Sequence, residues 1–294
     1  MREFELWGAP FDGGATLGWP GSRYGPEAIR RSLAWIRGRV EDEAVYWLDS
    51  ASHHDLSGNF LTDRGDAEVV PSDLMASLDA VSSAITDTMD KERVPIFVGG
   101  DDSMLFGAVR GFHRSVSGSV GLIYLDAHFD LADTNAKQGG FSQSSGMRRC
   151  LELDRVAPGA TIQVGLRNFN FPSSARYAED VGLQVLTAKT SIDIGVTDSV
   201  RRIVDRVGGA DHVVLTVDID VVDPAFAPGS GAHEPGGFSS RHFLDLVTGL
   251  APHCDALALM EVNPMIDVND TTSRLAATAI FDFAVSGQER RKTL

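Results

Sequence analysis

The chain has 294 residues, of which 43% are hydrophobic, and it carries a formal net charge of −15. This length fits one large domain or two ordinary ones, and the apolar fraction is sufficient for a sizeable core. The acidic balance argues against binding to nucleic acid or to anionic membranes, and no apolar run is long enough to span a membrane. Neither cysteine lies in a CxxC pattern and no signal peptide is evident, so we expect a cytoplasmic protein.

From the N-terminus onward, apolar runs typical of strands alternate with segments of helical periodicity. We expect strands at residues 3–8, 45–49, 94–98, 121–125, 160–166, 185–187, 213–217 and 254–260. We expect helices at residues 26–33, 72–91, 103–109, 199–207, 239–250 and 273–285. Residues 52–71 are expected to form a polar loop, with His53 and His54 at the surface. The alternation predicts a single-domain, three-layer α/β/α fold over residues 1–294, with a doubly wound, mostly parallel sheet.

Three of the apolar runs end in acidic side chains. The run at 121–125 is followed by Asp126, His128 and Asp130, the run at 213–217 by Asp218 and Asp220, and the run at 94–98 by Asp101 and Asp102. Because open α/β sheets carry their sites at the carboxyl ends of the strands, we expect these side chains to meet. Carboxylates this close repel one another unless a cation lies among them. Carboxylate and imidazole donors suit Mn, Fe, Co, Ni or Zn, so the pattern predicts a dinuclear metal centre.

Several motifs, in order, resemble those of the ureohydrolases, the family of arginase, agmatinase and formimidoylglutamase. They are GAPFDGG, PGSRYGPEAIR, GGDDS, DAHFD, TVDIDVVDP and MEVNP, at residues 8–14, 20–30, 99–103, 126–130, 216–224 and 260–264. The resemblance implies an arginase-like fold, a homo-oligomer and two Mn²⁺ ions per chain. The implied metal ligands are Asp102, Asp126, His128, Asp130, Asp218 and Asp220. Glu261, in the last motif, would hold the amidinium group of the substrate and serve catalysis.

The chain departs from the family pattern at two positions near these motifs. Asp102 stands where the family has a histidine ligand, so it either binds the metal as a carboxylate or turns away and leaves one site weak. Ser145 stands where arginases and agmatinases carry a histidine that moves protons, whereas formimidoylglutamases have Ser-Gly there. We expect Ser145 and Asn170 to contact the substrate. Since Ala132 replaces an arginine common in formimidoylglutamases, a glutamate carboxylate would need Arg167 or Arg148.

A further departure is His233, where the family usually has proline. The pKa of a histidine lies near neutrality, so His233 is a candidate acid/base that replaces the missing histidine. The alternative is a loop histidine in solvent. The preceding Ala232 is again similar to formimidoylglutamases.

These features together predict a Mn²⁺-dependent hydrolase of C–N bonds in linear amidines. The favoured substrate is of the formimidoylglutamate type, releasing formamide. The alternatives are a guanidino hydrolase of the agmatinase or arginase type, releasing urea, and a pseudoenzyme that binds metal without turnover. The expected partner is a small-molecule amidine or guanidine, with neither nucleic acid nor membrane involved.

Overall fold

The computed structural model describes residues 2–15, 18–58, 60–134 and 137–291. Its centre is an eight-stranded sheet in which every strand pairs with its neighbours in the parallel sense. In spatial order the strands are β4 (Leu61–Asp66), β1 (Phe4–Gly8), β5 (Val94–Val98), β10 (Ala256–Met260), β9 (His212–Asp218), β6 (Val120–Leu125), β7 (Ile162–Val164) and β8 (Gln184–Leu186). The predicted parallel sheet is therefore confirmed.

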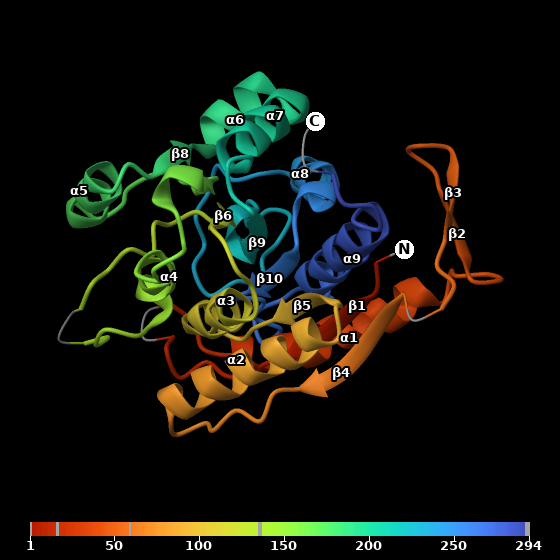
Figure 1. Cartoon of the computed structure of the whole chain (residues 1–294), viewed down its shortest axis with the longest axis horizontal. Helices are drawn as coiled ribbons and strands as arrows, with labels where there is room; N and C mark the ends of the chain where they lie inside the picture. The colour runs from red at the N-terminus through yellow and green to blue at the C-terminus, as the bar shows by residue number, and fades with distance from the viewer. Residues whose placement is uncertain (1, 16–17, 59, 135–136, 292–294) are drawn as a thin grey trace.

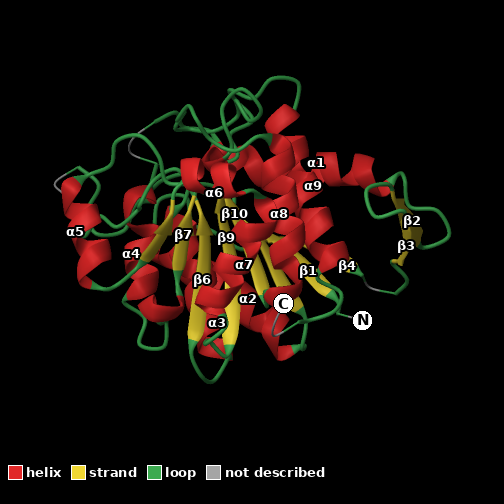
Figure 2. Cartoon of the chain, turned by 90° about the horizontal axis from the view of Figure 1, so that it is seen from above, coloured by secondary structure: helices red, strands yellow, loops and turns green. Residues whose placement is uncertain are grey.

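Helices cover both faces of this sheet (Figures 1 and 2). They are α1 (Gly25–Arg37), α2 (Leu74–Asp90), α3 (Ser103–Ser115), α4 (Gly146–Leu151), α5 (Pro172–Asp180), α6 (Ala188–Ile194), α7 (Val196–Val207), α8 (Ser240–Leu250) and α9 (Thr271–Ser286). One layer consists of α1, α9, α8 and α7, which pack side by side, and the other of α2, α3 and α4. Each layer has its own hydrophobic core against the sheet, as the doubly wound prediction requires.

The strand β6 shows why its sequence reads as a continuous apolar run. All six of its residues are buried. Ile123 and Leu125 pack into the core beneath one helical layer, whereas Leu122 and Tyr124 pack into the other. A parallel strand covered on both faces has no solvent side, so its pattern does not alternate.

The prediction of a loop over residues 52–71 is wrong. The segment contains β3 (Ser52–Asp55), which pairs in antiparallel fashion with β2 (Ala44–Trp47), and the edge strand β4. The hairpin of β2 and β3 forms a separate two-stranded sheet at one side of the molecule (Figures 1 and 2), with Val45 and Trp47 packed against the main core. Of β4 only Leu61 is buried; the strand lies at the edge of the sheet, and its other residues are half-buried or exposed. The short helices α4, α5 and α6 were also not predicted.

Among the described residues, no helix combines the length and the apolarity that a membrane crossing needs. The loops that follow β6, β9 and β10 gather at one edge of the sheet (Figure 2), and β5, which runs parallel to β10, ends at the same edge. These are the loops that carry the acidic motifs.

Candidate metal centre

Four adjacent strands bring the acidic side chains to one level. In the sheet, β5, β10, β9 and β6 are consecutive. Near their ends Val98 is paired with Leu259, Leu259 with Val217, and Val217 with Leu125. The residues that follow therefore leave the sheet together at its carboxyl edge, where ligand sites of such sheets lie.

The loop after β5 is wedged between the ends of β1 and β10. A Cβ atom on Gly100 would lie 1.8 Å from the carbonyl oxygen of Phe11, so only glycine fits here. The backbone N–H of Asp101 donates to that same carbonyl at 2.9 Å, and the N–H of Glu261 donates to the carbonyl of Gly100 at 2.8 Å. The backbone N–H of Asp102 then donates to Oε1 of Glu261 at 2.8 Å. Asp102 and Glu261 are thereby fixed beside one another.

The six predicted metal ligands form two groups of three. Asp126, His128 and Asp220 make up the imidazole site, and Asp102, Asp130 and Asp218 make up the carboxylate site. Within each group the donor atoms all lie within 4.8 Å of one another. Each group therefore has the spacing needed to hold one divalent cation.

In the imidazole site, backbone N–H groups orient the two carboxylates. The N–H of His128 donates to Oδ1 of Asp126 at 2.6 Å, and the N–H of Ala127 donates to Oδ1 of Asp220 at 3.1 Å. Nδ1 of His128 lies 3.0 Å from Oδ2 of Asp220, while Nε2 lies 3.6 Å from Oε1 of Glu234. A metal-binding imidazole commonly donates its other N–H to a carboxylate, and Glu234 lies at ion-pair distance from that nitrogen without a hydrogen bond.

In the carboxylate site, two of the three side chains have an outer partner. The Tyr124 hydroxyl donates to Oδ2 of Asp130 at 3.0 Å, and the N–H of Asp220 donates to Oδ1 of Asp218 at 2.8 Å. Asp102 is 1% exposed, and neither of its carboxylate oxygens finds a hydrogen-bond partner among the described residues. A buried carboxylate without partners is costly, and a cation would satisfy it. The donor set thus fits a bound metal.

The electrostatics of the centre also call for cations. Burial and repulsion by neighbouring carboxylates raise the pKa values of four acids well above their usual range, namely Asp102, Asp130, Asp218 and Glu261. Burial acts to lower the pKa of the His128 imidazole, but the carboxylates of Asp220 and Asp126 outweigh it and raise that pKa. In the absence of metal the centre therefore retains protons, which bound cations would displace.

Two of the acidic residues adopt a backbone conformation that non-glycine residues rarely take. The φ angle is +48° at Asp130 and +65° at Glu261. Such left-handed residues cost free energy and persist where the surroundings impose them, often at functional sites. Here the conformation accompanies side chains that line the same pocket.

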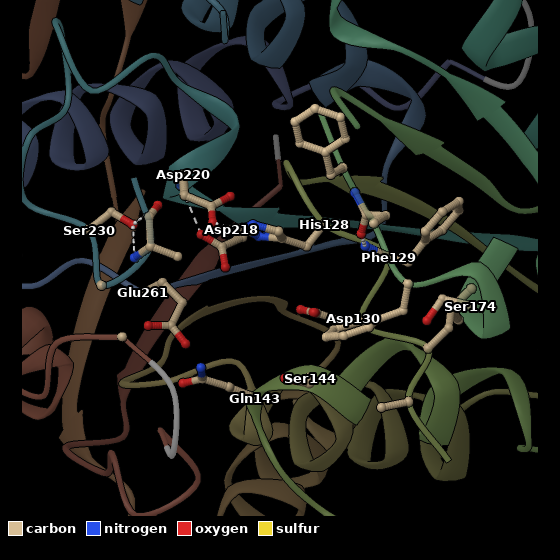
Figure 3. A pocket seen from close by; sticks show the side chains of 18 of the residues that line it. His128, Phe129, Asp130, Gln143, Ser144, Ser174, Asp218, Asp220, Ser230 and Glu261 are labelled. Carbon is tan, nitrogen blue, oxygen red and sulfur yellow. Dashed lines mark hydrogen bonds and ion pairs between the residues drawn. The ribbon is translucent and has the colours of Figure 1, made fainter. Parts of the chain in front are cut away.

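The pocket above the centre has a volume of about 390 Å³. Asp130, Asp218 and Glu261 turn their carboxylates toward one space in its floor (Figure 3). Its remaining lining includes Gln143, Ser144, Asn170, Ser174 and Ser230, and the aromatic side chains Trp19, Phe129, Phe169 and Phe171. Phe169 is 97% exposed and Phe171 is 66% exposed, so the aromatic rim is open to solvent. The arrangement combines an acidic floor with an apolar entrance.

The predicted substrate contacts differ in where they lie. Asn170 lines the pocket, and its Oδ1 accepts a hydrogen bond from the N–H of Phe129 at 3.2 Å. Ser145 is buried outside the lining, where its hydroxyl accepts from the N–H of Ser142 at 2.8 Å and donates to the carbonyl of Ser142 at 3.1 Å. The neighbouring Gln143 and Ser144 line the pocket instead.

Neither arginine expected to bind a carboxylate lines the pocket. Arg167 donates to four backbone carbonyls, those of Gly165, Asp220, Val221 and Glu234. Arg148 stacks on the ring of Tyr177 at 3.7 Å and pairs with Glu152 at 2.8 Å. Both guanidinium groups are therefore engaged with the protein itself.

His233 also lies outside the pocket lining. Its side chain is exposed, and Nε2 is 2.7 Å from the carbonyl oxygen of Pro228. The structure does not bring this imidazole to the metal-binding groups, whereas the next residue, Glu234, contacts His128.

Several site residues were not anticipated from the sequence, chiefly Tyr124, Glu234 and the aromatic rim. Tyr124 is the one hydroxyl-bearing residue of β6 and stands two positions before Asp126, so the alternation of a strand offered a signal for it. The loop aromatics had no such periodic signal.

Comparison with known proteins agrees with this geometry. The model of the arginase family matches residues 2–285. Proclavaminate amidinohydrolase from Streptomyces clavuligerus is 35% identical over 275 residues, 92% of this chain and 83% of that protein. Its solved structure superposes with a TM-score of 0.82 at 30% identity, over 98% of this chain and 91% of that one.

Two further relatives have other substrates in their names. Guanidinopropionase from Pseudomonas aeruginosa is 31% identical over 280 residues, 94% of this chain and 84% of that protein. Formimidoylglutamase from Halobacterium salinarum is 32% identical over 291 residues, 96% of this chain and 87% of that protein. The comparisons thus confirm the predicted family and arginase-like fold, and they favour no single member. With its parallel sheet and two metal-binding groups, the chain belongs to the arginase family and is a metal-dependent hydrolase of the ureohydrolase type.

Proposed function

We propose that this chain hydrolyses a C–N bond of a guanidino compound and releases urea, using two Mn²⁺ ions. The observation that supports this most directly is the pair of three-residue groups beside Glu261 at the floor of one pocket. Carboxylate oxygens with a single imidazole suit Mn²⁺. When bound, such a pair of ions supplies a strong nucleophile from water at neutral pH and offsets developing negative charge.

Glu261 is proposed to hold the planar cation of the substrate. Its side chain lines the pocket and is 8% exposed, so a pair with an amidinium would be shielded from water. Oε1 accepts the N–H of Asp102, and a carboxylate retains further lone pairs for the substrate. A carboxylate that accepts two N–H bonds from an amidinium supplies orientation as well as energy.

The charge of the centre favours a cationic substrate over formimidoylglutamate. Six carboxylates converge, those of Asp102, Asp126, Asp130, Asp218, Asp220 and Glu261. Two divalent ions would balance four of these charges, so about two negative charges remain. The described part of the pocket lining contains neither Lys nor Arg. The formamidinium head of formimidoylglutamate is attracted to such a site as a guanidinium is, but the two carboxylates of its glutamate tail are repelled.

Hydrolysis of a formimino compound, releasing formamide, is the second candidate. The Ser145–Gly146 pair and the DAHFDL sequence at residues 126–131 support it, since both are similar to formimidoylglutamases. Because Arg167 and Arg148 are engaged elsewhere, we expect such a substrate to carry fewer negative charges than glutamate.

A substrate panel with product analysis tests the proposal. The Mn²⁺-loaded protein is incubated with guanidino compounds that have cationic, neutral and anionic tails, and with formimino compounds that have neutral and anionic tails, including formimidoylglutamate. We expect urea from the guanidino compounds with cationic or neutral tails. Formamide from a formimino compound without urea from any guanidine would favour the second candidate. Full metal occupancy without any product would refute hydrolysis of these amidines and favour a pseudoenzyme.

The family resemblance supports an oligomeric state, and the composition supports a cellular compartment. We propose a homo-oligomer of this chain in the cytoplasm. Light scattering of the full-length protein tests the first point, and cell fractionation tests the second.

A further inference from the structure

The two metal-binding groups differ in the kind of donor atom that they offer. The imidazole site provides one nitrogen, from His128, and two carboxylates. The carboxylate site provides oxygen alone, because Asp102 supplies a carboxylate beside Asp130 and Asp218. The difference therefore depends on the residue type at positions 102 and 128.

The carboxylate site is held in place before any ion arrives. Tyr124 and the N–H of Asp220 fix one oxygen each on Asp130 and Asp218, at 3.0 and 2.8 Å. The backbone N–H of Asp102 donates to Oε1 of Glu261 at 2.8 Å, and both of its buried carboxylate oxygens lack a partner among the described residues. Two carboxylates oriented by hydrogen bonds, beside a third that is buried and wholly unsatisfied, make a preformed cation site rather than a surface cluster.

The space for the Asp102 carboxylate depends on a glycine of α4. A Cβ atom on Gly146 would lie 2.3 Å from Oδ2 of Asp102. The first residue of α4 therefore has to be small for this carboxylate to keep its place. The absence of a side chain at Gly146 thus leaves the space that the Asp102 carboxylate occupies.

The donor atoms of a site determine which divalent cations it binds most strongly. Oxygen donors suit hard cations such as Mg²⁺ and Mn²⁺, whereas an imidazole strengthens the binding of Zn²⁺, Co²⁺ and Ni²⁺. The preference for Zn²⁺ over Mn²⁺ is therefore expected to be smaller at the carboxylate site than at the imidazole site.

We propose that the centre assembles as a mixed pair when both kinds of ion are present, with Zn²⁺ or Co²⁺ at the imidazole site and Mn²⁺ or Mg²⁺ at the carboxylate site. This inference rests on the proposed two-ion centre, but it concerns ion selectivity, which can be measured without any substrate. Asp102 and His128 are its selectivity-determining residues.

A competition experiment on the full chain tests the inference. Metal-free protein is dialysed against two molar equivalents of Zn²⁺ with an excess of Mn²⁺, and bound metals are counted by mass spectrometry. We expect one Zn²⁺ and one Mn²⁺ per chain, with the electron paramagnetic resonance spectrum of an isolated Mn²⁺ rather than that of a coupled pair. Two Zn²⁺ per chain would overturn the selectivity and leave the two-ion centre intact. No bound metal would overturn the proposed function itself.

Substituting the distinguishing ligand of each site should shift the bound Zn²⁺/Mn²⁺ ratio in opposite directions. Asp102→His should let Zn²⁺ replace the Mn²⁺, and His128→Asp should lower the share of Zn²⁺. Changes around a metal ligand commonly alter affinity about 10–100-fold, so the bound Zn²⁺/Mn²⁺ ratio should shift by at least about tenfold in each variant. Asp102→Asn, of nearly the same size, should lose the Mn²⁺ and keep one Zn²⁺, which covers the case that the histidine variant fails to fold. The exposed His53, altered in His53→Ala, serves as a control for adventitious binding. Unchanged ratios in all three centre variants would overturn the inference.

Discussion

Replacing Glu261 by glutamine isolates its charge from its other contacts. A glutamine side-chain oxygen can still accept the N–H of Asp102, so the position of Asp102 and the metal content should be retained. The amidinium of the substrate, however, loses a buried charge partner. Removing one member of such a pair costs about 3–5 kcal/mol, which corresponds to a loss of roughly 150- to 5,000-fold in kcat/KM.

The assay is steady-state urea release by Mn²⁺-loaded Glu261→Gln beside the parent protein, with metal content measured on the same samples. Glu27→Gln, on the exposed surface of α1, is the matched control and should turn over like the parent. The metal-free form of Glu261→Gln should also melt at a higher temperature, because burial and neighbouring carboxylates raise the pKa of Glu261 and force it to take up a proton on folding, whereas glutamine is neutral in both states. A decrease of less than about tenfold in kcat/KM with full metal content would refute the assignment of Glu261 to the substrate cation.

Four further predictions concern the surroundings of the centre. The pKa values of its buried acids are raised in the folded, metal-free protein, so the melting temperature of that form should fall as pH rises from about 5 to 8. The increase in melting temperature caused by Mn²⁺ should grow over the same range, and calorimetry measures both. Gly146→Ala should lower Mn²⁺ stoichiometry in metal analysis by crowding Asp102, whereas Gly159→Ala, whose Cβ meets nothing within 4 Å, should not. Arg167→Lys should lose several bonds to carbonyls and destabilise by about 2–3 kcal/mol, seen as a lower melting temperature with KM little changed. His233→Ala should leave kcat within about twofold at every pH, since its ring faces Pro228, and a larger decrease would restore it as an acid/base candidate.

The fold could be predicted where burial dictates the sequence. Strands such as β6 and β9 are covered on both faces, so they read as unbroken apolar runs. The edge strand β4 could not be predicted in this way, because it is stabilised by backbone pairing with β1 while its side chains remain polar.

The site was predictable to the extent that strands position it. Asp126, His128 and Asp130 follow a strand at alternate positions, and the sheet register brings them to the other acids. The loop side chains depend on distant contacts instead. Arg167 is directed by carbonyls that lie 53 to 67 residues further along the chain, and no local pattern reports them.

Two ions are expected to occupy the two described groups of ligands. Crystals of the Mn²⁺-loaded protein, measured on both sides of the manganese absorption edge, show where the bound ions lie. We expect two anomalous peaks per chain, one among Asp126, His128 and Asp220 and the other among Asp102, Asp130 and Asp218. A single peak, or peaks away from these side chains, would rule out this two-ion centre.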